Sequence, residues 1–577
     1  MSSSYIMELT KNENGGVAHD WVLVNEEQNT LITEKELGDM FVQFYFQCVL
    51  GNTVSPSIST INLAEKFDEL LLCCCNHGGE YLDYVVKLCL QNRDIKQGKG
   101  LCSHSYMMLN VFAFYSYEKN LIPTNSVIKI LKSFVYDKFN EDEQNYEHPY
   151  GSWKDIKYFL DLFRNDRKYQ YTNITKQEII NDIICQVYIP QMIHDRKNMS
   201  VNQPISLCGK WLPRESSKKF GWIAKVLARE YYKEVYRVSV ICNKVEVFKI
   251  YRKLSSDLNK YLDTTQIHMT GNCWDKINFN NVTSKTIFLN KNAFMNTKMI
   301  NEEHRIVCKE NFQNYIIDKE QNGNIMKNNN NVMPHDLVRE ALRNANCEDK
   351  RTLSILNMQW NGLMKNMENK SFLKFCYPCI DVSPSMLSEN NIPLHCAIGL
   401  GLACAHLSKR NRAFTFSSNP EWIKYLENET FVERVYKTRN SNWGSTTNIH
   451  KLFTHILSIC QNPSVVPQSD IDETSLVIFS DMQFDGHEEY PEEELFKIIR
   501  NEYEAAGYNN IPFLVFWNLR TTGTFPTIEK SKNMIKLSGN SASLLKIFMN
   551  TTVENLKKLE NWDLLKQVLD NKRYLIS

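Results

Sequence analysis

The stretch that decides the fold is Phe375–Ile380 (FCYPCI), followed at once by Asp381-Val382-Ser383-Pro384-Ser385. A short apolar run that ends in Asp and Ser is typical of a buried strand that stops at a ligand-binding edge. Similar apolar runs lie at 413–416, 476–479, 513–517 and 534–537, and helical stretches lie at 392–407, 448–460, 492–506 and from residue 542. This alternation, with strands apolar on both faces, predicts a parallel sheet covered on two sides, a doubly wound (Rossmann-like) α/β domain.

The chain before this region has a helical pattern. Apolar residues recur at intervals of three and four, as in Phe67, Leu70, Leu71 and Cys74. Glycine and proline fall between such segments, which predicts a train of short helices of the HEAT-like α-solenoid kind, although no exact repeat is found. We therefore expect a multidomain α plus α/β protein. Its predicted parts are a polar N-terminal lead-in (1–35), a helical repeat domain (36–345) with an Asn-rich loop at 322–331, and an α/β domain with C-terminal helices (370–577).

The composition narrows the classes of function that the chain can have. The 577 residues carry 67 Lys plus Arg and 66 Asp plus Glu, a formal net charge of +1, which excludes a polybasic nucleic-acid coat and an acidic tail. The 17 cysteines are odd in number and scattered, as in a reducing interior. No apolar run is long enough to span a bilayer and no signal peptide is visible. We expect a soluble, cytoplasmic protein with no membrane partner, and a viral protein in a host cell or virion is compatible with this expectation. No oligomeric state is predicted.

The residues that carry chemistry follow the predicted strands. Asp381, Ser383 and Ser385 follow the first strand, Asp481 follows the strand at 476–479, and Thr447 lies before a helix. Because the carboxyl ends of parallel strands meet at one edge, we expect these side chains to converge. Two carboxylates and three hydroxyls are hard oxygen ligands, which suit Mg²⁺ or Mn²⁺ better than Zn²⁺.

This pattern resembles the metal-ion-dependent adhesion site (MIDAS) of the von Willebrand factor A domain, which has Asp-x-Ser-x-Ser, then a Thr, then an Asp. The resemblance implies that Asp381, Ser383, Ser385, Thr447 and Asp481 are the metal ligands. Thr447 is preferred to Thr446 because Asn448 stands where the family often has Asp. It also implies that an Asp or Glu from a protein partner completes the coordination of the metal.

The resemblance extends to the helical part. Its motifs are Arg93-Asp94 with Gly98-Lys99-Gly100, Tyr150–Asp155, Lys210–Pro213, Tyr251–Leu254 and Trp274–Ile277. They are similar to the TROVE module of the Ro RNA-binding proteins. The strings Phe516–Arg520 and Phe479–Asp485 resemble a family of uncharacterised Ro-like proteins of plants, amoebae and large DNA viruses. The resemblance implies a ring or arch of helices closed by the A domain.

Basic residues in the helical part give independent but weaker support for RNA binding. The candidates for contact with single-stranded or structured RNA are Lys210, Lys218, Lys219, Lys225, Arg229, Lys233, Arg237, Arg252 and Lys253. Four of them recur every fourth residue on one helix face, near tyrosines that could stack on bases. Interleaved glutamates favour the alternative of a balanced, solvated helix face.

These observations predict a non-enzymatic RNA-binding or ribonucleoprotein scaffold with a metal-dependent, partner-binding A domain. A protein-interaction or assembly scaffold without RNA is the alternative, in a virus or its host. An enzyme has the least support, because no general base or activated nucleophile can be named. The Cys376-x-x-Cys379 pair lies inside a predicted strand and is expected to pack in the core.

Overall fold

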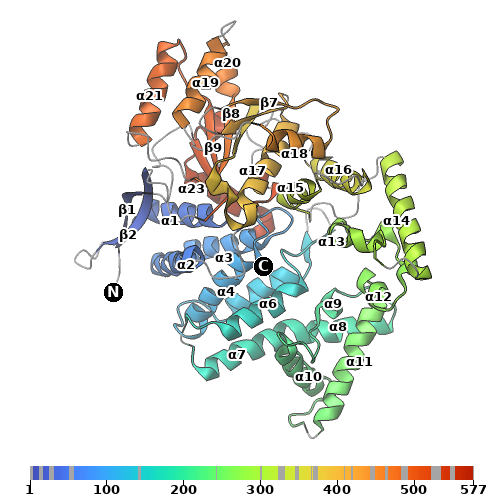
Figure 1. Cartoon of the computed structure of the whole chain (residues 1–577). Coiled ribbons are helices and arrows are strands. Elements are labelled where there is room, and N and C mark those ends of the chain that lie inside the picture. Colours follow the sequence, from blue (N-terminus) through green and yellow to red (C-terminus); the bar gives the residue numbers. More distant parts are fainter. Residues whose placement is uncertain are drawn as a thin grey trace.

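The computed structural model has a mostly helical N-terminal half and a C-terminal half built around a sheet (Figure 1). It describes residues 4–575 except 12–16, 25–31, 51–57, 141–144, 170, 242, 299–301, 323–331, 345–349, 366, 368–374, 409, 417–419, 442–448, 462–465, 483–491, 522–533, 543 and 546–552. The predicted combination of a helical module with an α/β domain is thus confirmed at the level of fold class.

The helices of the first half lead away from the sheet through α10 and return through α11–α14 to α15 and α16 (Figure 1). Their bounds are α1 Glu34–Gln47, α2 Ile58–His77, α3 Gly79–Arg93, α4 Cys102–Tyr117, α5 Asn125–Val135, α6 Trp153–Asn165, α7 Asn173–Ile183, α8 Ile189–Ser200, α9 Cys208–Trp211, α10 Gly221–Tyr236, α11 Lys244–Leu262, α12 Thr265–Thr270, α13 Ser284–Phe294, α14 Glu303–Asn322, α15 Pro334–Arg343 and α16 Lys350–Lys365. Two hairpins accompany them, β1 Ser4–Lys11 with β2 Val17–Val24 and β3 Lys138–Asn140 with β4 Asn145–Glu147.

The second half contains the main sheet and the helices around it. Its described elements are β5 Cys376–Asp381, α17 Ser388–Leu407, β6 Arg412–Phe416, β7 Trp422–Lys424, α18 Phe431–Arg439, α19 Ile449–Gln461, α20 Gln468–Glu473, β8 Ser475–Ser480, α21 Glu492–Ala505, β9 Phe513–Asn518, β10 Met534–Ser538, α22 Val553–Leu556 and α23 Asn561–Leu569. The strands expected from the sequence are all present.

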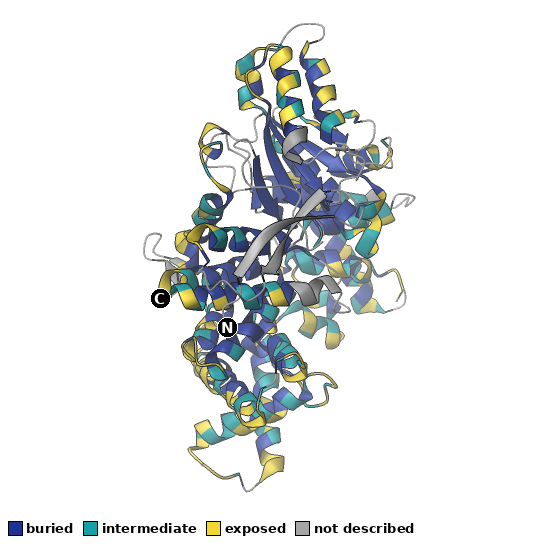
Figure 2. Cartoon of the chain, turned by 90° about the vertical axis from the view of Figure 1, so that its left-hand side faces the viewer, coloured by how far each residue is buried: buried dark blue, intermediate teal, exposed yellow. Residues whose placement is uncertain are grey.

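The main sheet has the strand order β10-β9-β8-β5-β6-β7. Its strands pair in parallel except at the edge, where β7 runs antiparallel to β6, so the sheet is mixed and not wholly parallel as predicted. Alternate residues of a strand face opposite sides. Val477 and Phe479 of β8 share a core with α17, whereas Leu476 and Ile478 share the other core with α19 and α21. Figure 2 shows this buried sheet as dark blue strands among the helices.

Local sequence explains where several helices begin. Thr33 caps α1 and Glu36 bonds back to it, and Ser152 and Asp155 form the same reciprocal capping box at α6. Such boxes satisfy backbone N–H groups that lack partners in the first turn. These capping residues therefore account for where α1 and α6 begin.

Other parts differ from expectation or lie outside the described residues. The polar lead-in contains the β1–β2 hairpin, which the sequence analysis did not predict. Residues 323–331 of the Asn-rich loop are outside the described chain, and Asn322 ends α14. The helix expected from residue 542 also falls largely on such residues. No described helix is both long and apolar enough to cross a membrane.

The two halves share an extensive joint. The helix α1 packs against the edge strand β10 and against α23. Trp562 of α23 stacks on Phe41 of α1, with ring centroids 4.8 Å apart. Arg573 forms a bidentate ion pair with Asp94, and both side chains are buried. Since an edge strand exposes unpaired backbone groups, its coverage by α1 also protects the sheet.

Candidate metal centre and basic surface

The predicted metal ligands gather at one edge of the main sheet. β5 ends at Asp381, and the neighbouring β8 ends at Ser480, which Asp481 follows. The parallel register sets Ile380 opposite Phe479, so the two aspartates leave adjacent strands at the same edge. Both aspartates are fully buried. The expectation that the strand ends bring these carboxylates together is therefore met by the geometry.

Hydrogen bonds fix the Asp381 carboxylate. The backbone N–H of Ser383 donates to Oδ1 at 2.9 Å, and the hydroxyl of Ser480 donates to Oδ2 at 2.5 Å. The Oγ atoms of Ser383 and Ser385 lie 3.0 Å apart. Ser480 was not among the predicted residues, and the only signal for it in the sequence is its place immediately before Asp481.

The two carboxylates repel each other. Burial and, next, the neighbouring charge of Asp481 raise the pKa of Asp381 to about 7. One cation is near, because the Arg520 guanidinium lies 3.4 Å from Oδ2 of Asp481. Arg520 was not predicted either. Two buried like charges of this kind are stabilised when a cation binds between them.

The donor set fits a hard divalent ion. Neighbouring ligands of an octahedral Mg²⁺ stand about 3 Å apart when each lies at about 2.1 Å from the ion, and the Ser383 and Ser385 hydroxyls have this spacing. Among the described residues no three His, Cys, Asp or Glu side chains form a metal-ligand group, so an ion would depend on the two aspartates and the hydroxyls. Thr447 lies outside the described residues.

Two groups of the predicted basic residues differ in their surroundings. In one group each cation has a carboxylate close by: Lys233 with Glu230 at 2.8 Å, Arg237 with Glu234 at 3.0 Å and Arg252 with Glu215 at 2.6 Å. For these residues the balanced helix face is the better interpretation. Lys225, Arg229 and Lys253 are exposed, and so is Lys218.

The second group belongs to what we call the lysine–aromatic surface. It comprises Lys154, Lys157 and Tyr158 of α6, Lys210 and Trp211 of α9, and Lys219 and Phe220 before α10. Lys157 Nζ lies 4.8 Å from the Trp211 ring centroid and 5.2 Å from that of Phe220. The ammonium groups of Lys154, Lys210 and Lys219 lie within 4.9–5.7 Å of these rings or of Tyr158. The three rings are half-buried and the lysine side chains reach solvent.

The charge on this surface is poorly balanced. Burial and the nearby Lys154 lower the pKa of Lys157, and burial lowers that of Lys210. Within the described part of the chain, the ion pair that these lysines form is that of Lys219 with Asp161 at 3.2 Å. Lysines held over aromatic rings without carboxylates are ready to bind an anion from outside. Lys210 and Lys219 were predicted from the sequence, whereas Lys154, which lies in the Tyr150–Asp155 motif, and Lys157, two residues beyond that motif, were not.

Several other motif residues have structural roles. Arg93 forms a buried ion pair with Asp155 at 2.6 Å. Lys99 is buried with its ammonium against the carbonyl of Cys48 at 2.9 Å and the hydroxyl of Ser538 at 2.6 Å. These residues join α3 to α6 and the helical half to β10, so they hold the fold together and do not form a ligand site.

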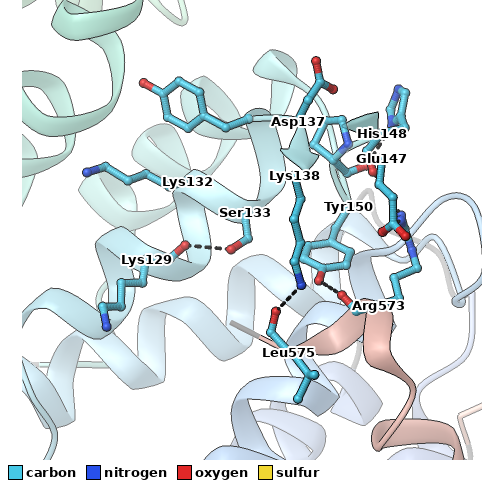
Figure 3. Close-up of a pocket in the computed structure, with 12 residues that line it drawn as sticks. Lys129, Lys132, Ser133, Asp137, Lys138, Glu147, His148, Tyr150, Arg573 and Leu575 are labelled. Atoms are coloured by element: carbon cyan, nitrogen blue, oxygen red, sulfur yellow. Dashed lines mark hydrogen bonds and ion pairs between the residues drawn. The ribbon is translucent and has the colours of Figure 1, made fainter. Parts of the chain in front are cut away.

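A cavity of about 210 Å³ lies beside the joint, where the C-terminal segment crosses the helical half (Figure 3). Lys138 donates to the Leu575 carbonyl at 2.7 Å, and the Tyr150 hydroxyl donates to the Arg573 carbonyl. Lys129 and Lys132 extend away from Lys138 and do not converge with it on one point. The cavity therefore belongs to the joint and offers no built anion site.

Comparisons with known families match most of the chain in two consecutive segments. Residues 179–373 match a family model described as "Domain of unknown function (DUF2828)", and residues 376–573 match one described as "Domain of unknown function (DUF7788)". The two matches meet between α16 and β5, at the change from the helical half to the sheet.

Two similar proteins extend over nearly the whole chain. "Uncharacterized protein L728" of Acanthamoeba polyphaga mimivirus is 25% identical over 526 residues, which cover 89% of this chain and 82% of that protein. The crystal structure of the Ro (RSR) protein of Deinococcus radiodurans is 10% identical, covers 89% of this chain and 99% of its own, and has a TM-score of 0.38.

Proposed function

We propose that this chain is a non-enzymatic RNA-binding scaffold. The observation that carries the proposal is the lysine–aromatic surface, where the ammonium groups of Lys154, Lys157, Lys210 and Lys219 stand over three half-buried rings. Lysine charges attract phosphates by releasing counterions, and aromatic faces stack on unpaired bases. A single strand offers both groups together, which favours unpaired RNA or a single-stranded region of a structured RNA.

The proposal agrees with the charge of the whole chain. A formal total of +1 requires any nucleic-acid contact to be local. The lysine–aromatic surface is local in this sense, because among the described residues Asp161 is the one carboxylate that pairs with its four lysines. Lys233 near the end of α10 and Arg237 after it contribute less, since glutamates balance their charges.

Filter binding with a labelled single-stranded RNA at two salt concentrations tests this function. The wild-type chain should lose affinity as salt rises. The double variant Lys157→Ala/Lys210→Ala should bind more weakly, with a salt slope smaller by about 1.4 for two lost phosphate contacts to a single strand. Lys424→Ala, an exposed lysine of β7, is the matched control. Absence of binding by the wild type at low salt, or an unchanged slope in the double variant, contradicts the proposal.

A second function is favoured by the metal centre. We propose that the α/β domain is a von Willebrand A-like domain that binds a protein partner through Mg²⁺ or Mn²⁺. Asp381, Ser383, Ser385 and Asp481, with Thr447 outside the described residues, would hold the ion. The ion would supply a positive charge that an Asp or Glu of the partner can approach. The pair of buried aspartates supports this proposal, because a bound cation would offset the burial and mutual repulsion that raise the pKa of Asp381.

Thermal unfolding with and without Mg²⁺ tests the metal centre. For a dissociation constant near 0.1 mM, adding 1 mM Mg²⁺ should stabilise the protein by roughly 1.4 kcal/mol. Asp381→Ala should abolish the shift, and Glu427→Gln, which changes an exposed carboxylate, should not. An equal shift in both variants argues against the centre. If RNA binding fails while the metal effect holds, a protein-interaction scaffold without RNA becomes the better proposal.

A further inference from the structure

A groove of about 680 Å³ lies beside the loop that leads into α10. Its walls are residues 213–216, one side of α11, and Ile267, Thr270 and Gly271 at α12. The α11 wall is made by residues 251, 255 and 259 and by residues 252, 256 and 260. Positions four apart lie above one another on a helix, so these are two neighbouring rows that face one groove. We call it the α11 groove.

The α11 groove presents polar side chains that the fold does not use. The hydroxyls of Ser216, Ser255 and Ser256 and the charged ends of Arg214 and Lys260 have no hydrogen-bond or ion-pair partner within the described chain. Asn259 is different, because it donates to the carbonyls of Gly209 and Ser255 and fixes the wall. Hydroxyls and cations that converge in this way are available to a ligand.

The charge of the groove selects an anionic ligand. Arg214, Arg252 and Lys260 are cations and Glu215 is the carboxylate among the lining residues, which gives a formal charge of +2. Glu215 is already paired with Arg252 at 2.6 Å. Within the described chain, Arg214 and Lys260 are therefore the lining cations without a carboxylate partner, and they lie at two sides of the groove.

The chemistry of the lining also excludes base stacking in the groove. Tyr251 is the aromatic residue that lines it, and this side chain is buried with its hydroxyl donating to the Pro213 carbonyl at 2.8 Å. A ligand with phosphates and hydroxyls, and without need for a ring, is the best match. Sugar–phosphate backbone has this composition, since cations contact phosphates and serine hydroxyls can exchange hydrogen bonds with a ribose 2′-OH.

The α11 groove adjoins the lysine–aromatic surface. The loop that forms one wall of the groove, 213–216, continues to Lys219 and Phe220 on that surface. The loop is internally bonded, because Phe220 N–H donates to the Ser217 hydroxyl at 3.1 Å and Gly221 N–H to the Ser217 carbonyl at 2.9 Å. A strand whose bases stack over Trp211 and Phe220 can therefore pass its backbone into the groove.

We propose that the α11 groove binds the ribose–phosphate backbone of a single-stranded RNA and makes the protein prefer RNA to DNA of the same sequence. This inference rests on the proposed RNA-binding function and adds where the backbone lies and which sugar is selected. Arg214 and Lys260 contact phosphates. Ser255 and Ser256 contact the 2′-OH groups that DNA lacks.

The test compares a labelled 12-nucleotide oligo(U) RNA with the oligo(dU) DNA of the same length, using the full chain. The double variant Ser255→Ala/Ser256→Ala should lose about tenfold in RNA affinity and leave DNA affinity unchanged, so that the preference for RNA disappears. Lys260→Ala should weaken both and reduce the salt slope by about 0.7. Ser126→Ala on α5 is the matched serine control, and thermal unfolding of each variant verifies folding.

The outcomes separate the two proposals. If RNA binds the wild type and the serine double variant keeps its preference for RNA, the groove inference is overturned while the RNA-binding function stands. If RNA does not bind the wild type but the metal effect remains, both the RNA function and the groove inference are wrong. Equal binding of RNA and DNA by the wild type also overturns the groove inference.

Discussion

Replacing Arg573 with methionine should loosen the joint between the two halves of the protein. Arg573 donates to Asp94 from Nε and from one Nη atom, each at 2.7 Å, and the side chains are 6% and 0% exposed. Breaking a buried ion pair costs about 3–5 kcal/mol because the remaining charge has no partner. Asp94 keeps the Tyr574 hydroxyl and the Lys96 and Gln97 N–H groups as donors, so we expect the lower end, about 3 kcal/mol.

Urea unfolding, followed by tryptophan fluorescence and far-ultraviolet circular dichroism, measures this loss. Lys558→Met is the control, since that lysine and its partner Glu554 are 67% and 79% exposed and such pairs contribute less than about 1 kcal/mol. Asp94→Asn in the Arg573→Met background removes the buried carboxylate charge that has lost its partner and should recover part of the stability. An Arg573→Met variant that stays within about 0.5 kcal/mol of the control refutes the reasoning.

Two further predictions concern packing and pH. Gly38→Ala places a Cβ 2.7 Å from the Trp562 ring, which stacks on Phe41. This substitution should lower the free energy of unfolding, measured with urea, by about 1–3 kcal/mol. Gly79→Ala, whose Cβ meets no atom within 4 Å, should leave stability unchanged. Burial lowers the pKa of His335 and His395 to about 4. Their unfolded pKa is near 6.5, so stability is retained above pH 6.5 and lost as pH falls toward 4, about 2 kcal/mol per histidine at pH 5. Stability measured at pH 7 and 5 should differ less in His395→Gln, and an unchanged difference contradicts this assignment.

The sequence alone predicted that Asp381 and Asp481 lie together at the candidate metal centre, because strand ends can be recognised from apolar runs. Asp381 and Asp481 each follow such a run, and parallel strands bring their ends to one edge. Ser480 and Arg520 were missed for a different reason. The Ser480 hydrogen bond depends on the register between β5 and β8. The Arg520 contact depends on the turn after β9. Neither is encoded in a local sequence pattern.

The basic surface likewise has features that the sequence predicts and contacts that only the fold shows. Helical spacing predicted Lys233 and Arg237 on one helix face, but α10 ends at Tyr236 and Arg237 follows it with a left-handed backbone. The charges of both residues are paired with glutamates three residues before them. The lysine–aromatic surface combines segments more than fifty residues apart, for example Lys157 with Trp211, and such contacts become visible only in the fold. The strand β7 was not predicted from the sequence because three residues are too few for a periodic pattern.

The metal centre and the helical half are also linked through the turn after β9. The side-chain amide of Asn518 donates to the Phe46 carbonyl and the hydroxyl of Thr521 donates to the Gln47 carbonyl, each at 2.9 Å. Both carbonyls belong to the last turn of α1, where helix carbonyls lack partners within the helix. Arg520, which contacts Asp481, is thus held on both sides by the first helix of the other half. A cation bound between Asp381 and Asp481 would neutralise the Asp481 carboxylate and so replace part of the stabilisation that Arg520 gives it. Because the same short turn anchors α1, we expect the stabilisation by Mg²⁺ to appear in the unfolding of α1 and β10 together.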